Sequence, residues 1–233
     1  MAPSIRWPLA SRDSTAIEEM DRPDADPALL RRTYAGFPIV NRFVSRPGQL
    51  YRDYVLPYLK HGRTTTLLDV GCGGGDIAAY LARRAERDGY TLHVLGVDPN
   101  PAAHAFAASA HPEVEFRRAT SGDLVAEGAR FDVVLSNHVL HHLTPAELEG
   151  LLRDSEALAT GTAVHADLRR SVVAYVLFAV AALPFARRSF IRRDGLTSLR
   201  RSYTPAELQA AAPAGWTNTP RAPFRNVLVH RAG

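Results

Sequence analysis

A glycine-rich turn between an apolar segment and a helical pattern constrains the fold of this chain more than any other feature. Residues 65–70 (TTLLDV) run without a polar alternation, which predicts a strand buried on both faces of a parallel sheet. Four glycines follow within residues 71–75, and glycine adopts positive φ and places no side chain between backbone and ligand. From residue 76 apolar residues recur at helical spacing. A strand, a glycine turn and a helix in this order predict a nucleotide-cofactor site at the carboxyl end of the strand.

The residues around the glycines distinguish between cofactors. A dinucleotide-binding turn has Gly or Ala at its sixth position, where the helix begins and binds a pyrophosphate. Here Asp76 occupies that position, and Asp69 precedes the turn. Two carboxylates beside a phosphate are electrostatically unfavourable, so the turn suits a cationic ligand. The pattern D-x-G-x-G-x-G over residues 69–75 resembles motif I of the class I S-adenosylmethionine (SAM)-dependent methyltransferases, whose ligand carries an ammonium and a sulfonium group.

This resemblance covers roughly residues 64–231 and implies SAM as the cofactor. The glycine turn and Asp69 would hold the methionine part. Asp98 ends the next expected strand and is placed to accept hydrogen bonds from the ribose hydroxyls. The acid that binds the adenine amino group in the family is replaced here by Thr120 and Ser121, so we expect the Ser121 hydroxyl or the Ala119 backbone to make that contact. The cofactor-binding residues that we predict are Asp69, Gly71, Cys72, Gly73, Gly75, Asp76, Asp98, Pro99, Ser121, Asn137 and His138.

Composition indicates one catalytic domain with a small appendage. The chain has 233 residues, 46% of them hydrophobic, which is enough for one substantial core. Cys72 is the single cysteine, so no intrachain disulfide can form and we expect a cytoplasmic location. Residues 1–20 contain charges and no continuous apolar core, so no signal peptide is expected. The net charge of +4 comes from arginine pairs scattered without an aromatic platform, so we expect no nucleic-acid partner.

The order of patterns predicts an α/β fold: a Rossmann-like, seven-stranded, mostly parallel sheet with an antiparallel last strand and helices on both faces. Residues 1–26 are rich in Pro, Ser, Ala and charge, and we expect them to be flexible. Residues 27–62 carry aromatic residues at helical spacing and predict extra N-terminal helices, the second spanning 47–59. We expect residues 63–233 to form the methyltransferase domain that the resemblance implies, with an insertion at 169–203 that we interpret as a lid.

Three histidines follow the fourth expected strand, in residues 137–143 (NHVLHHL). The segment resembles motif IV and the loop after it, which lies beside the transferable methyl group in this superfamily. An imidazole there can take a phenolic proton, so His142 is our preferred catalytic base and His141 the second candidate. Neighbouring residues on a helical turn point about 100° apart, so at most one of the two should face the pocket. No Cys, Asp or Glu in the segment completes a ligand set, and we expect no metal site.

Residues 172–185 of the insertion are almost wholly apolar. At ~1.5 Å per residue this stretch is too short to span a bilayer core of ~30 Å, so we expect no stable membrane span. It is a lid over the substrate, a packing or dimer surface, or an interfacial segment with peripheral membrane contact. Arginines at 192, 193 and 200 either steer an anionic acceptor or lie on solvated faces. The substrate-binding residues that we predict are Tyr34, Phe37, Tyr51, Tyr175 and Phe178.

Together these patterns resemble a SAM-dependent methyltransferase for a small aromatic or lipophilic acceptor. We expect O-methylation of a phenol, a quinol or a polyketide-derived ring in secondary metabolism. Two alternatives are C-methylation of a quinol-like ring and a non-catalytic SAM-binding partner subunit. The oligomeric state is either monomer or homodimer.

Overall fold

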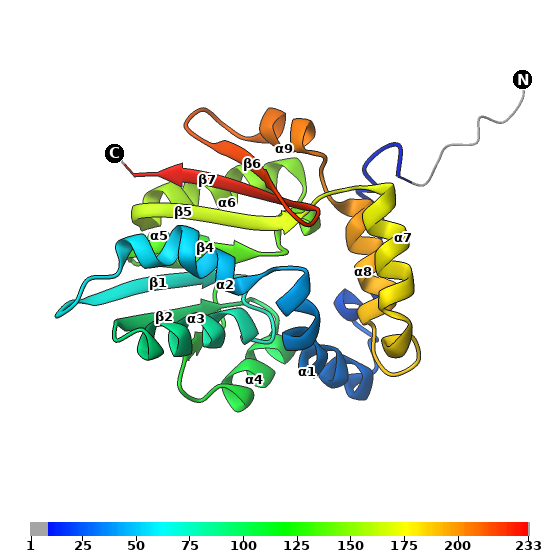
Figure 1. Cartoon of the computed structure of the whole chain (residues 1–233), viewed down its shortest axis with the longest axis horizontal. Coiled ribbons are helices and arrows are strands. Elements are labelled where there is room, and N and C mark those ends of the chain that lie inside the picture. Colours follow the sequence, from blue (N-terminus) through cyan, green and yellow to red (C-terminus); the bar gives the residue numbers. More distant parts are fainter. Residues whose placement is uncertain (1–8, 233) are drawn as a thin grey trace, which may run out of the picture.

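The computed structural model describes residues 9–232 and is built on one seven-stranded sheet (Figure 1). The strand order is β3-β2-β1-β4-β5-β7-β6. The strands are β1 (Thr64–Val70), β2 (Thr91–Val97), β3 (Glu115–Arg117), β4 (Phe131–Asn137), β5 (Ala159–Leu168), β6 (Thr217–Arg221) and β7 (Arg225–Arg231). The predicted Rossmann-like α/β fold is confirmed.

The sheet is parallel except for β7. Strands β1 to β5 pair in parallel, whereas β7 runs antiparallel to both β5 and β6. Only three residues separate β6 from β7, which makes them a hairpin, and a tight hairpin requires antiparallel strands. The predicted antiparallel last strand is therefore confirmed, and it lies between β5 and the edge strand β6.

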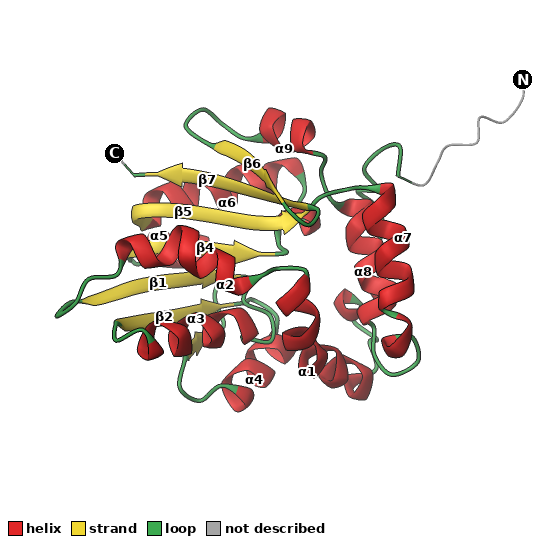
Figure 2. Ribbon diagram, viewed as in Figure 1, coloured by secondary structure: helices red, strands yellow, loops and turns green. Residues whose placement is uncertain are grey.

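Helices cover both faces of the sheet (Figure 2). The helices are α1 (Pro27–Phe43), α2 (Pro47–Leu50), α3 (Asp76–Arg87), α4 (Pro101–Ala110), α5 (Ser121–Ala126), α6 (Pro145–Leu158), α7 (Val172–Ala181), α8 (Ile191–Arg201) and α9 (Pro205–Ala211). Successive side chains of β1 point to opposite faces of the sheet, so the core has one part on each face. Leu67 packs with α3 and the segment around Tyr51, whereas Leu68 packs with α5 and α6 on the opposite face.

The N-terminal helical region differs from the prediction in its second part. Helix α1 begins at the Asp26 cap as expected, and its carboxylate accepts hydrogen bonds from the amides of Ala28 and Leu29. Residues 47–58 do not form one regular helix. They form α2, a π-helical turn (Tyr51–Val55) and a 3-10 turn (Leu56–Tyr58), and the change to a 3-10 turn coincides with Pro57, which has no amide hydrogen to donate.

The insertion at 169–203 places two helices beyond the carboxyl ends of the parallel strands. Helices α7 and α8 pack against each other, and α1 lies beside α8 across this end of the sheet (Figure 1). The Ser171 hydroxyl accepts from the Ala174 amide and caps α7. No helix among residues 9–232 is long and apolar enough to cross a membrane.

Residues 9–26 correct the expectation of a flexible segment. They form a strap, which we call the N-terminal strap, that lies between α8 and the loop after β4. The Arg12 guanidinium donates to the carbonyl oxygens of His141, Leu143 and Arg201. Glu18 is only 3% exposed. The composition of the segment is that of a loose tail, but specific polar contacts to folded elements hold it, and composition does not reveal such contacts. Residues 1–8 lie outside the described part of the chain.

Candidate active site

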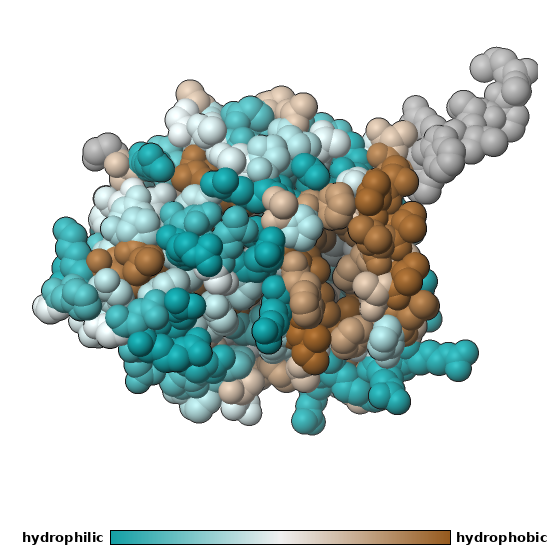
Figure 3. All heavy atoms as spheres, viewed as in Figure 1, coloured by the Kyte–Doolittle hydropathy of each residue, from teal (hydrophilic) through white to brown (hydrophobic). Residues whose placement is uncertain are grey.

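One cavity of about 650 Å³ lies at the carboxyl edge of the parallel strands. Its walls come from the glycine turn, the loops after β2 and β4, helices α1, α7 and α8, and the N-terminal strap. Figure 3 shows this region as a hollow bordered by apolar residues of α7. A cavity at this edge of an open parallel sheet is the expected place for a ligand. It is large enough to contain a cofactor and part of a second molecule.

The conformation of the glycine turn is fixed by positive φ angles and by hydrogen bonds from its backbone amides. Gly71, Gly73 and Gly75 have φ values of 68°, 53° and 78°, a region that L-residues rarely adopt. The amides of Gly71 and Cys72 donate to the Val97 carbonyl oxygen, which ties the turn to the end of β2. The Gly73 amide donates to a carboxylate oxygen of Asp98. The turn therefore presents a bare backbone surface to the cavity.

Three carboxylates gather beside this turn. Asp69, Asp76 and Asp98 all line the cavity. Burial raises the pKa of each of them, and the negative charges of Asp76 and Asp98 raise the pKa of Asp69 further. Asp69 is 1% exposed and its Oδ2 has no hydrogen-bond partner among the described residues. A buried, unpaired carboxylate with two acidic neighbours is the environment that a cationic ligand would stabilise.

Helix α1 contributes a polar relay that the sequence patterns did not reveal. Asn41 donates from Nδ2 to Asp76 at 3.0 Å and accepts from the Ser45 hydroxyl at 3.0 Å. Ser45 in turn accepts from Asn137 Nδ2 and lies 3.3 Å from His138 Nε2. The end of α1, the first turn of α3 and the end of β4 are therefore joined at the cofactor side of the cavity.

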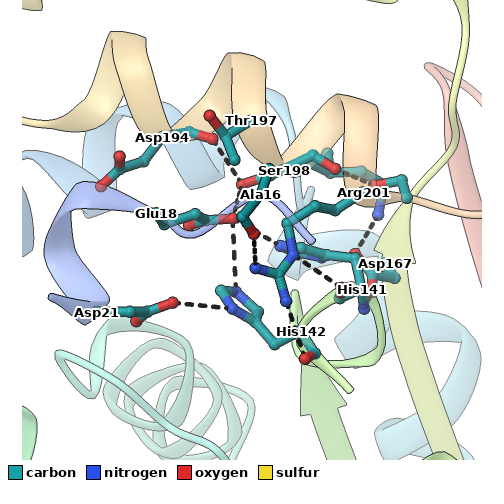
Figure 4. A network of polar contacts seen from close by, with 12 residues as sticks. Ala16, Glu18, Asp21, His141, His142, Asp167, Asp194, Thr197, Ser198 and Arg201 are labelled. Atoms are coloured by element: carbon teal, nitrogen blue, oxygen red, sulfur yellow. Dashed lines mark hydrogen bonds and ion pairs between the residues drawn. The ribbon is translucent and has the colours of Figure 1, made fainter. Parts of the chain in front are cut away.

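The loop after β4 brings two histidines to the cavity wall, where they meet residues of the N-terminal strap and α8 (Figure 4). Both His141 and His142 line it, so the expectation that only one would face the pocket is wrong. The two rings belong to a 3-10 turn (Leu140–His142), and their centroids are 4.2 Å apart. His138 also lines the cavity, on the side of Ser45, with a φ of 61°.

His141 is buried between two carboxylates. Its Nδ1 lies 2.7 Å from Asp167 Oδ1, and its Nε2 lies 3.3 Å from Glu18 Oε1. Burial alone would lower the pKa of His141, but Asp167 and Glu18 together raise it to about 10. Burial alone would raise the pKa of Glu18, but the bond from His141 and the charges of both histidines lower it to about 2. The three groups form a buried ion triad in which His141 is protonated at neutral pH.

His142 is more accessible and has a different partner. Its side chain is 30% exposed, and its Nδ1 lies 3.1 Å from Asp21 of the N-terminal strap. Its Nε2 lies 3.8 Å from Glu18. Arg201 donates to the main-chain oxygens of His141 and His142 and so fixes this loop against α8.

The same cluster contains atoms that a metal ion requires. Glu18, His141 and His142 each offer a ligand atom within 4.8 Å of the others, and the sequence patterns missed this set because Glu18 is far away along the chain. Asp167 and Asp21 contact the Nδ1 atoms of the histidines, and the Nε2 atoms of both face Glu18, which also accepts from the Ser198 hydroxyl. A carboxylate on the second ring nitrogen is compatible with a metal-binding histidine as well as with an ion pair, and the contacts that the structure shows are those of an ion-pair network.

The aromatic residues predicted to contact a substrate fall into two groups. Tyr34, Phe37 and Phe178 line the cavity. Tyr51 does not, because it is 1% exposed and packs in the core against α3. Tyr175 packs against Leu168 and its neighbours on α7 and α8 and also lies outside the cavity wall. The predicted substrate contacts of Tyr51 and Tyr175 are therefore wrong. Each side chain lies on the side of its helical segment that packs against the protein and not on the side that faces the cavity.

Two predicted cofactor residues also lie outside the wall. The Ser121 hydroxyl donates to Asp154 at 2.6 Å, so it is engaged between α5 and α6. A Cβ on Gly75 would lie 2.6 Å from the Phe116 ring, so this glycine serves close packing between the turn and β3. The other predicted cofactor residues, from Asp69 to His138, do line the cavity: Asp69, Gly71, Cys72, Gly73, Asp76, Asp98, Pro99, Asn137 and His138.

Acidic residues from two unexpected places complete the wall. Glu18 and Asp21 come from the N-terminal strap, and Asp194 from α8. Asp194 accepts from the amides of Glu19 and Met20, which holds the strap against α8. Burial raises the pKa of Asp194 to about 7, and these two hydrogen bonds oppose the rise. No motif signalled these carboxylates, and the nearest signal was an acidic run at residues 18–21.

Comparison with known proteins agrees with this geometry. Residues 67–161 match the family model described as a methyltransferase domain. The chain is 34% identical to the ubiquinone biosynthesis O-methyltransferase of Azorhizobium caulinodans over 152 residues, 62% of this chain and 55% of that protein. The corresponding Methylobacterium protein (strain 4-46) is 32% identical over 64% of this chain and 58% of its own length. The chain thus spans little more than half the length of these relatives.

Solved structures share the fold. Magnesium protoporphyrin IX methyltransferase from Synechocystis with bound SAM superposes with a TM-score of 0.53, at 16% identity, over 85% of this chain and 81% of that one. Human N-acetylserotonin methyltransferase in complex with SAM gives a TM-score of 0.58, at 11% identity, over 86% of this chain and 55% of that one.

The fold and the cavity at the glycine turn define the methyltransferase class of Rossmann-like proteins. Within it, the methyltransferase domain matched at residues 67–161, the similar O-methyltransferases and the shared fold support a class I SAM-dependent methyltransferase.

Proposed function

We propose that this protein binds SAM at the glycine turn and transfers its methyl group to a small hydroxylated aromatic acceptor. One observation carries the cofactor proposal. Asp69, Asp76 and Asp98 surround a bare glycine backbone, and no lysine or arginine is among the cavity-lining residues that the structure describes. The ammonium and sulfonium groups of SAM would supply the missing positive charge. The turn and Asp69 would hold the methionine part, and Asp98 would accept from the ribose hydroxyls.

The reaction is an in-line displacement of the methyl group from the sulfonium. A nucleophilic oxygen forms a bond to the methyl carbon while the carbon–sulfur bond breaks, and the electron pair stays on sulfur. Holding the two reactants in this alignment can supply ~7–11 kcal/mol of the barrier. The cavity supports this role because the histidine loop and the glycine turn line the same space.

We propose His142 as the base that removes the acceptor proton. Its side chain is partly exposed to the cavity, and Asp21 contacts Nδ1 and would orient the ring. A neutral imidazole can take a phenolic proton as the oxygen approaches the methyl group. His141 suits the role less, since two carboxylates hold its proton.

The acceptor that we favour is a phenol or quinol. The relatives are named for ubiquinone biosynthesis, which supports a quinol-type ring more than a polyketide-derived one. C-methylation of a quinol-like ring would use the same cofactor site, and a non-catalytic SAM-binding subunit would keep the cofactor site alone. We expect a reducing, cytoplasmic setting and a monomer or homodimer.

Calorimetry and a turnover assay test this function. We expect micromolar affinity for S-adenosylhomocysteine (SAH), none for NAD or NADH, and methyl transfer to catechol- or quinol-type acceptors. Replacement His142→Gln should lower kcat by about 100-fold or more, within the usual range for loss of a general base. The matched control is His93→Gln, because His93 is about half exposed at the start of β2 and away from the cavity. Absence of SAH binding would overturn the proposal, and binding without turnover on any acceptor would favour a non-catalytic subunit.

A further inference from the structure

The charges around the cavity are strongly one-sided. Six carboxylates line it, three beside the glycine turn and three on the acceptor side: Asp69, Asp76, Asp98, Glu18, Asp21 and Asp194. The whole chain has 28 Lys and Arg residues, yet among residues 9–232 none of them lines this cavity. The arginines of the insertion therefore do not offer a binding site for an anionic acceptor, which corrects one of the roles predicted for them.

The cationic groups nearest to the acceptor side are already engaged. Arg201 donates to the carbonyl oxygens of Ala16, His141 and His142. Arg12 donates to three carbonyl oxygens in the same place, one of which is the His141 oxygen that Arg201 also contacts. Both side chains therefore stabilise the backbone behind the cavity wall, and neither forms an ion pair with a carboxylate that lines the cavity.

The histidines do not neutralise the acceptor side either. The positive charge of His141 lies between Asp167 and Glu18, so that triad has a net negative charge. Burial lowers the pKa of His138 to about 4, which makes it neutral at physiological pH. Asp21 is ion-paired only when His142 is protonated. Asp194, whose pKa burial raises to about 7, is only partly ionised at neutral pH, so the negative charge of the acceptor side comes mainly from the triad and Asp21. Bound SAM would offset part of the charge beside the glycine turn and leave this negative charge in place.

The mouth of the cavity has the opposite character. Val40 and Phe43 of α1, the adjoining Val44, and Leu177 and Phe178 of α7 line it. Phe43 is 68% exposed and Leu177 is 57% exposed, so the apolar lining continues to the outer surface. Figure 3 shows this continuity along α7. A molecule in the cavity would thus meet an acidic inner end and an apolar exit between α1 and α7.

We propose that the acceptor is an uncharged hydroxylated ring with an apolar substituent that leaves between α1 and α7, and that a ring carrying a carboxylate is excluded. This inference rests on the proposed methyl transfer and specifies its substrate. At an effective dielectric constant of ~20, one like charge at ~6 Å costs a factor of ~100 in affinity. Burial of an alkyl chain at the mouth adds affinity at ~0.8 kcal/mol per CH₂, which makes apolar substituents favourable.

A matched set of acceptors tests the inference. The set contains catechol, 2,3-dihydroxybenzoate, 4-nonylcatechol and the nonyl-substituted dihydroxybenzoate, each assayed with SAM at pH 7 in the presence of EDTA. We expect kcat/KM to be at least about 100-fold higher for each neutral ring than for its carboxylated counterpart. We also expect the nonyl chain to raise kcat/KM at least about 10-fold, mainly through KM.

Two pairs of variants assign these preferences to residues. Asp21→Asn should lower the ratio of kcat/KM between the neutral and the carboxylated ring about 10-fold or more. Asp24→Asn should leave this ratio unchanged, because Asp24 is an exposed strap residue outside the cavity wall. Phe43→Ser should reduce the advantage of the nonyl chain, whereas Ile17→Ser should leave it unchanged, because Ile17 is 67% exposed and does not line the cavity.

The outcomes separate the inference from the proposed function. Equal turnover of neutral and carboxylated rings would overturn the inference and leave methyl transfer intact. Acceptance of the carboxylated ring only when a divalent cation replaces EDTA would also overturn it. If SAH binds but no ring is methylated, the affinities of the four rings for the SAH complex are measured by calorimetry. Equal affinities of the carboxylated and the neutral rings would overturn the inference. Failure to bind SAH would remove both.

Discussion

Replacement of Glu18 by Gln is the most informative perturbation of the site network. Glu18 is the carboxylate through which the N-terminal strap contacts both the histidine loop and α8: it accepts from the Ser198 hydroxyl at 2.7 Å and lies 3.3 Å from His141 Nε2. The side chains of Glu18 and His141 are 4% and 1% exposed, so solvent screens their interaction little. Gln preserves the volume and one acceptor but removes the charge that stabilises protonated His141.

The expected size of the effect follows from the pKa of Glu18. The pair lowers it from 4.5 to about 2, which corresponds to about 3 kcal/mol of unfolding free energy. Loss of one partner of a buried pair costs ~3–5 kcal/mol in general, which agrees. A carboxyl group with a lowered pKa stabilises the fold above its unfolded value, so this contribution is complete above pH 4.5 and is lost as the pH falls through about 2.

His141 sets the alkaline limit of the same interaction. Its pKa is raised from 6.5 to about 10, so its contribution is complete below pH 6.5 and is lost as the pH rises through about 10. The penalty of Glu18→Gln should therefore be largest between about pH 5 and 7 and should decrease toward pH 10. In a chain of this length ~3 kcal/mol corresponds to a fall in Tm of about 6–12 °C.

Urea unfolding at pH 6, 8 and 10, followed by circular dichroism, measures this dependence. The control is Glu19→Gln, which changes the neighbouring residue in the same 3-10 turn (Glu19–Asp21) but breaks no ion pair within residues 9–232. We expect the control to change the unfolding free energy by less than about 0.5 kcal/mol. A loss below about 1 kcal/mol for Glu18→Gln at pH 6, or a loss that is independent of pH, would refute the buried triad.

Two further predictions concern the cofactor side. Gly75→Ala should lower the unfolding free energy by at least about 2 kcal/mol, because it combines a φ of 78° with a Cβ 2.6 Å from the Phe116 ring. Gly73→Ala should cost only the backbone strain of ~1 kcal/mol, since no atom lies within 4 Å of its added Cβ, and equal costs for the two variants would contradict the packing role. Asp98→Asn should weaken SAH binding about 10-fold or more in calorimetry, whereas Asp24→Asn should not, and unchanged affinity in both would exclude Asp98 from the ribose contact.

Interactions between sequence neighbours made much of the fold predictable. Capping boxes form at Thr144 and Thr204 because each side chain bonds to the amide three residues later, an interaction between near neighbours in the sequence. The glycine turn, the buried strand before it and the helix after it were identified from residues 65–87 alone. The seven strands and the antiparallel last strand agree with the prediction, and the short connection between β6 and β7 determined their antiparallel pairing.

The chemistry of the acceptor side depended on contacts between distant parts of the chain. Glu18 and Ser198 are 180 residues apart in the sequence, and no local pattern relates them. The composition of the strap predicted mobility because it contains little apolar surface, yet Glu18, Arg12 and Asp194 provide specific polar contacts that hold it. For the same reason the expectation of no metal-ligand set considered only the histidine segment and did not include Glu18.

By itself the sequence determined the class of fold, the position of the cofactor turn and the carboxylates beside it, because these depend on residues within a few positions of one another. Only the tertiary structure decided which aromatic and ionisable side chains face the cavity. Tyr34 lines it and Tyr51 does not, although both lie in aromatic-bearing helical segments. The physical reason is that the direction of a side chain is set by the elements packed against its helix, and those elements come from remote parts of the chain.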